Sequence, residues 1–140
     1  MRIFIFAAIT YFGIVFGAGF MLGAVRELVV APRLGEARAE LLEMPVMLVI
    51  VYYAARLVVG RFRIEKIAVA LTVGSAALGL LLALEFTLVL AVRGLTLDSW
   101  YANRDPAALA AYLAGLLVFA LMPAAIRALR ARRRGDEIGD

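Results

Sequence analysis

The sequence lacks cysteine, histidine and glutamine, and it contains a single lysine, Lys66, and a single asparagine, Asn103. Without thiols, the chain has no disulfides, thiolate nucleophiles or iron–sulfur clusters. Without imidazole, it lacks the usual axial haem ligand, most zinc sites and the commonest general base. Carboxylates, arginines, five tyrosines and a few hydroxyl groups remain for chemistry. We therefore expect neither a metal nor a cofactor.

Apolar residues, by contrast, are in excess. They make up 65% of the chain and charged residues 19%, against roughly half and a quarter in a soluble domain. A helix rises about 1.5 Å per residue, so a run of roughly 20 apolar residues crosses a ~30 Å hydrocarbon layer. Four runs of about this length follow one another, at residues 3–25, 44–60, 67–92 and 107–126.

These runs predict an all-α membrane protein: an up-down bundle of four transmembrane helices over residues 1–126, and a cytoplasmic, arginine-rich tail over 127–140. The first run is longer than the apolar core of a signal peptide, and no A-x-A cleavage site follows it. We therefore expect this helix to be retained. The short turn at 61–66 predicts that the second and third helices are antiparallel neighbours.

Two prolines shape the connection between the first two long helices. Pro32 disfavours helical backbone at Ala31, which predicts that the first helix ends there. Residues 36–43 are expected to form a short interfacial helix that leads into the second transmembrane helix. Pro45 should kink or break that junction, because its ring removes one helical hydrogen bond.

Two further prolines lie in the last helix. Asp105 followed by Pro106 predicts a capped helix start, with the proline in the first turn. Pro123 has no N–H to donate four residues back, so it should bend the helix and leave the carbonyl of Phe119 without its usual partner.

The distribution of basic residues predicts the orientation. An even number of spans places both termini on one side, which would carry nine basic residues against five on the other. Basic residues concentrate in cytoplasmic loops, so we expect a bacterial-type inner membrane protein with both termini in the cytoplasm. Trp100 and Tyr101 would then lie at the outer interface.

The net charge of +4 does not indicate nucleic-acid binding, because the arginines of the tail directly follow an apolar run. Arginines beside a membrane contact anionic lipids. The residues predicted to contact lipid headgroups are Arg56, Arg61, Arg63, Arg127 and Arg130.

Glu85 is the one charged residue between positions 67 and 92. An ionised carboxylate in lipid costs much free energy, so the Glu85 side chain should face other helices. There it would either have a functional role or hold two helices together through a hydrogen bond or ion pair. By helical rise, Arg56 lies roughly 20 Å from it along the membrane normal and is not its partner. The residues predicted to share a ligand-binding or ion-binding site with Glu85 are Glu43 and Arg26 at its centre and Arg38, Glu40 and Arg93 around it.

Glu36, Glu40 and Glu43 share one helix face. They could bind a hard cation through carboxylate oxygens, but an amphipathic interfacial helix with its charged face in water is the favoured interpretation. Arg26 could fold back and compensate their charge, whereas Arg38 lies on the opposite face.

Small residues recur on the first helix, at Gly13, Gly17, Gly19 and Gly23. Such spacing lets another backbone approach closely, within one chain or between chains. Tyr11 and Tyr112 could act as proton donors, although structural hydrogen bonds are the favoured interpretation.

Three functions follow, in order of preference. The first is a packing, accessory or self-assembling membrane subunit without catalytic chemistry, partnered by the lipid bilayer and by copies of itself or a larger complex. The second is an oligomeric transporter or channel that uses Glu85 as a proton or cation site. The third is a lipid-active enzyme at the outer interface, acting through Glu43 and Glu85 with Arg26 or Arg38 holding a phosphate.

Overall fold

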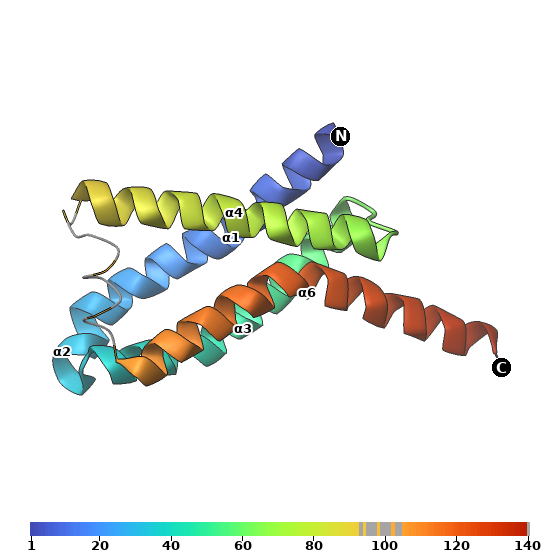
Figure 1. Ribbon diagram of the computed structural model, residues 1–140. Helices are drawn as coiled ribbons and strands as arrows, with labels where there is room; N and C mark the ends of the chain where they lie inside the picture. The colour runs from blue at the N-terminus through green and yellow to red at the C-terminus, as the bar shows by residue number, and fades with distance from the viewer. Residues whose placement is uncertain (93, 95–97, 99–101, 103–104, 140) are drawn as a thin grey trace.

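The structure is a computed structural model that describes residues 1–92, 94, 98, 102 and 105–139. These residues form helices and no strands, which confirms the predicted all-α class. The elements are α1 Arg2–Val25, the π-helical turn η1 Arg26–Val30, α2 Ala31–Leu34, α3 Glu36–Arg61, α4 Ile67–Val92 and α6 Pro106–Ile138 (Figure 1). Trp100, Tyr101 and Arg93, for which predictions were made, lie outside the described residues.

Four helical segments are long and apolar enough to cross a membrane: Arg2–Leu34, Glu36–Arg61, Ile67–Leu88 and Pro106–Ile138. The chain is therefore a helical, multi-pass membrane protein by length and composition. The arginine-rich tail continues α6 as helix. The C-terminal part of α6 therefore extends well beyond the other helices (Figure 1).

The first helix does not end at Ala31 as predicted. Its path continues through η1 and α2 to Leu34, and it stops at Gly35, whose φ of 86° favours glycine. The π-helical turn explains the continuation, because Ala31 N–H bonds to the carbonyl of Arg26, five residues back. This change of register places Pro32 at the start of a new helical segment, where a missing N–H costs little.

Pro45 lies inside α3 without breaking it, since the helix runs from Glu36 to Arg61. Residues 36–43 therefore form the first turns of α3. The separate short element between the two long helices is instead α2, which has four residues.

The start of α6 agrees with the sequence prediction. The carboxylate of Asp105 accepts hydrogen bonds from the backbone N–H of Ala107 at 2.9 Å and of Ala108 at 3.2 Å. Pro106 occupies the first turn, where its missing N–H leaves no bond unmade.

Helix α6 packs against both α3 and α4, and α1 also packs against both (Figure 1). The described residues of α3 and α4 have few contacts with each other, although a short turn joins them. The prediction that these two helices are packed neighbours is therefore wrong. Gly74 shows why α4 prefers α6: a Cβ there would lie 1.9 Å from the carbonyl oxygen of Ala120, so only glycine permits this close crossing.

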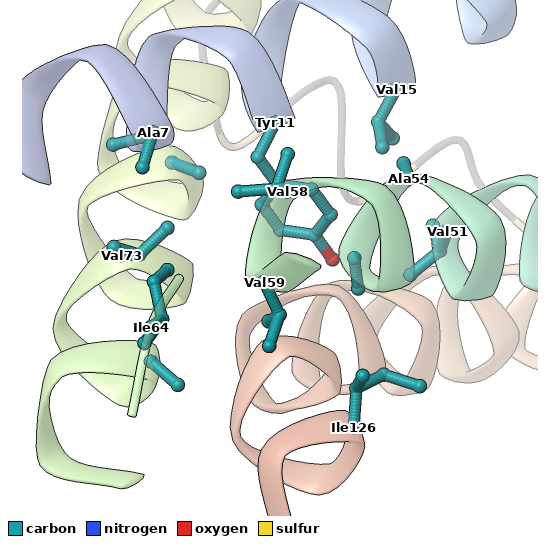
Figure 2. Close-up of a cluster of buried hydrophobic side chains, with 14 of the residues drawn as sticks. Ala7, Tyr11, Val15, Val51, Ala54, Val58, Val59, Ile64, Val73 and Ile126 are labelled. Carbon is teal, nitrogen blue, oxygen red and sulfur yellow. The ribbon is translucent and has the colours of Figure 1, made fainter. Parts of the chain in front are cut away.

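The core lies where α1, α3, α4 and α6 meet, and most of its side chains are small (Figure 2). Tyr11 is the largest side chain in it and is fully buried. It reaches from α1 into the cluster and stacks on Phe119 of α6, with ring centroids 4.6 Å apart. Small residues let the helices come close, and one aromatic pair fills the space that remains.

Candidate functional site

A cavity of about 350 Å³ opens between α1, α3, α4 and α6. Apolar side chains form most of its wall, including Met47 and Leu81. Five polar side chains also line it: Arg26, Glu40, Glu43, Glu85 and Tyr112. Pockets that are mostly apolar, with a few converging polar groups, are the usual form of a ligand site.

Arg26 enters this cavity from the first position of the π-helical turn. Its guanidinium lies 3.3 Å from a carboxylate oxygen of Glu43, 3.6 Å from Glu40 and 3.4 Å from Glu27. The Arg26 side chain is 24% exposed, so its charge is largely removed from solvent. The π-turn itself is a feature often found at functional sites, because it re-aims the side chains around it.

Glu40 and Glu43 come from the first turns of α3 and are 20% and 17% exposed. The favoured prediction, an acidic face in water, therefore describes the exposed Glu36 and not these two residues. The predicted compensation by Arg26 is present, as its ion pairs show. Glu43 Oε2 is shielded from solvent and has no hydrogen-bond partner in the described part of the chain, so the Arg26 charge stabilises it.

Glu85 of α4 accepts a hydrogen bond from the hydroxyl of Tyr112 on α6. Sequence reasoning did not find this pair. The depth calculation that excluded Arg56 could have found it. Glu85 lies roughly 10 Å before the end of α4, and Tyr112 lies roughly 10 Å after the start of α6, so the two residues are at the same level. The hydroxyl of Tyr112 thus makes a hydrogen bond between helices, as the favoured interpretation expected.

The remaining predicted residues lie elsewhere. Arg38 is exposed and does not line the cavity. Arg56 and Arg61 are exposed near the end of α3. Arg63, Arg127 and Arg130 line a second cavity of about 570 Å³, formed by the end of α3, the turn that follows it and the last part of α6.

The polar cavity therefore contains one guanidinium, three carboxylates and one phenol from four different elements. Such groups can hold a proton, bind a polar headgroup or tie helices together. Among the described residues, no three His, Cys, Asp or Glu side chains converge closely enough to hold a metal ion.

Comparison of the chain with protein-family models, curated proteins and solved structures gives no match. The class that the fold and cavity define is a small helical multi-pass membrane protein with a polar group of side chains inside it.

Proposed function

We propose that this chain is a self-assembling or accessory subunit of the bacterial inner membrane, without catalytic chemistry of its own. Its four long helices would cross the bilayer alternately, with both termini in the cytoplasm. The support for this orientation is the excess of basic residues on the side of the termini.

The observation that carries the proposal is an unpacked glycine face on α1. Gly13 and Gly17 are exposed, and a Cβ added to either would meet nothing within 4 Å. Other glycines are used inside the chain, since Gly74 meets α6 and Gly115 meets Met44. Helix association in lipid relies on close van der Waals packing at small residues. A second copy of α1 is the partner that this face suits, because each glycine pair admits the backbone of the other.

The polar cavity is consistent with a structural role. Arg26 joins the π-helical turn to α3 through Glu40 and Glu43, and Glu85 joins α4 to α6 through Tyr112. Polar pairs of this kind hold helices together in a membrane, where the alternative is a polar group in hydrocarbon.

Native mass spectrometry of the complex, purified gently from its membrane, tests the proposal. We expect a homo-oligomer or a complex with a larger partner, and a shift to the monomer in Gly13→Leu/Gly17→Leu. Ala68→Leu is the matched control, because Ala68 is an exposed small residue on α4. A monomeric wild-type chain, or equal masses in wild type and the glycine variant, would count against self-assembly through α1.

A second candidate, an oligomeric transporter with Glu85 as a proton or cation site, is favoured by the cavity itself. Three glutamates line it, and one of them, Glu85, lies within the apolar run of α4. An ionisable side chain within a membrane-spanning segment is typical of a proton or cation pathway. Proton and cation flux into liposomes should then be lost in Glu85→Gln and kept in Arg38→Gln. Equal flux in wild-type and empty liposomes would exclude this function.

A further inference from the structure

The second cavity lies at the end of the molecule opposite Arg26, and it is rich in arginine. Its wall carries Arg63, Arg127, Arg130, Arg133 and Arg134, together with two glutamates, Glu65 and Glu137. We name this feature the arginine groove. Five arginines against two glutamates around one space of about 570 Å³ give it an excess of positive charge.

Backbone contacts hold two of these arginines in place. The Nε of Arg127 donates to the carbonyl of Glu65 in the turn after α3, and Nη2 of Arg130 donates to the carbonyl of Arg56 at 3.0 Å. Each bond uses part of a guanidinium that has five N–H donors. The remaining donors of both side chains are therefore pre-oriented in the groove, which lowers the entropy lost when an anion binds.

Gly60 makes room for this arrangement. A Cβ at Gly60 would lie 3.2 Å from Nη2 of Arg130 and 3.3 Å from Nη1, closer than normal packing. The glycine thus allows the Arg130 guanidinium to lie directly on α3.

The end of α3 places a third arginine, Arg63, beside these two. Its φ of 49° lies in the left-handed region, which a residue with a Cβ adopts at a cost. The N–H of Arg63 bonds to the carbonyl of Gly60 at 3.3 Å and that of Ile64 to the carbonyl of Val59 at 3.1 Å, so this conformation ends α3 in a Schellman motif. Here it accompanies a turn that brings Arg63 to the wall of the groove.

The level of the groove is that of lipid headgroups. Helix α6 has 33 residues and is about 50 Å long, whereas the hydrocarbon layer is ~30 Å thick. Its continuous apolar run ends at Ile126, directly before Arg127, so we expect the groove to begin where the hydrocarbon ends.

We propose that the arginine groove binds the phosphate of an anionic phospholipid. Guanidinium groups form paired, charge-assisted hydrogen bonds with phosphate oxygens. The position of the groove next to the bilayer favours a lipid headgroup over a phosphate compound in solution, although the two share the same phosphate chemistry.

Binding can be measured by native mass spectrometry of the detergent-purified protein with phosphatidylglycerol and phosphatidylcholine of identical acyl chains. The test variant is Arg133→Gln/Arg134→Gln, because both side chains are exposed and its folding should be normal. The matched control is Arg2→Gln/Arg132→Gln, which removes the same charge from exposed residues outside the groove. A third variant, Gly60→Leu, keeps every charge and displaces Arg130.

We expect wild type to prefer phosphatidylglycerol, and the affinity to fall about tenfold or more in the test variant, as expected for two arginine–phosphate contacts. Gly60→Leu should also bind more weakly, whereas the control should bind nearly as wild type. Equal losses in the test and control variants would show that only net charge matters and would overturn the proposal. Displacement by inorganic phosphate with no preference between the two lipids would overturn the lipid as ligand and assign the groove to a soluble phosphate.

Discussion

The hydroxyl of Tyr11 donates a hydrogen bond to the carbonyl oxygen of Phe119, 2.7 Å away and 108 positions later in the chain. That carbonyl is the one left without a helical partner by Pro123, because proline has no N–H to donate four residues back. The same tyrosine ring stacks on Phe119, with 14° between the ring planes. Helix α1 thus supplies the hydrogen bond that α6 lacks, at a point where no water is available in a membrane.

Tyr11→Phe should lower the free energy of unfolding by about 1 kcal/mol, because it removes this bond and keeps the aromatic stack. Pro123→Ala provides the control, since the restored N–H of residue 123 can bond to the carbonyl of Phe119. In that background the loss from Tyr11→Phe should be less than about 0.5 kcal/mol. Unfolding by denaturant in detergent micelles measures both values. Equal losses in the two backgrounds would mean that the hydroxyl and Pro123 are not coupled.

Gly74 and Gly79 form a matched pair on α4. A Cβ at Gly74 would lie 1.9 Å from the carbonyl oxygen of Ala120, whereas one at Gly79 would meet nothing within 4 Å. We expect Gly74→Ala to destabilise the protein by about 1–3 kcal/mol, because α4 and α6 must move apart. Gly79→Ala should be neutral or stabilising, by up to about 1 kcal/mol, since alanine is the better helix former. Thermal melts in detergent would show this difference, and similar melts for both variants would contradict the close crossing.

The sequence was sufficient to predict those features that depend on local chemistry. Long apolar runs gave the four helices that could cross a membrane, and Asp105 before Pro106 gave the start of α6. The carbonyl freed by Pro123 was also predictable, because it follows from the geometry of a single helix.

Features that depend on how helices pack could not be predicted in this way. The π-helical turn carries the first helix past Pro32, and no short motif in the sequence marks it. The packing of α4 against α6 depends on the fit of Gly74 to Ala120, which is a contact between distant segments. Depth along the helices predicted that Arg26, Glu43 and Glu85 lie together, and the same calculation gives Tyr112 the level of Glu85. That α6 packs against α4, and so brings Tyr112 to Glu85, required the helix arrangement.

Arg26→Gln should destabilise the protein, because it leaves Glu40 and Glu43 as like charges in a site that is mostly shielded from solvent. Both side chains retain some exposure, so we expect a loss of about 1–3 kcal/mol, less than for a fully buried pair. Arg26→Gln/Glu43→Gln should recover part of this loss, because it removes one of the unpaired charges. Arg38→Gln is the control and should change stability by less than about 0.5 kcal/mol, as an exposed side chain. Recovery is the decisive result. If the double variant loses as much stability as the two single variants added together, Arg26 does not stabilise Glu43.

Glu85 and Tyr112 can be tested together, because their hydrogen bond connects α4 to α6. If this bond is a structural connection, Tyr112→Phe and Glu85→Gln should each lower the melting temperature in detergent. A double-mutant cycle should give a coupling energy of about 1–2 kcal/mol, as for a hydrogen bond to a charged acceptor. Tyr53→Phe serves as the control: Tyr53 is 62% exposed, so removal of its hydroxyl should change the melting temperature little. Unchanged melts in both single variants would remove the structural role, and they would make the Glu85 carboxylate a candidate for proton or cation transport instead.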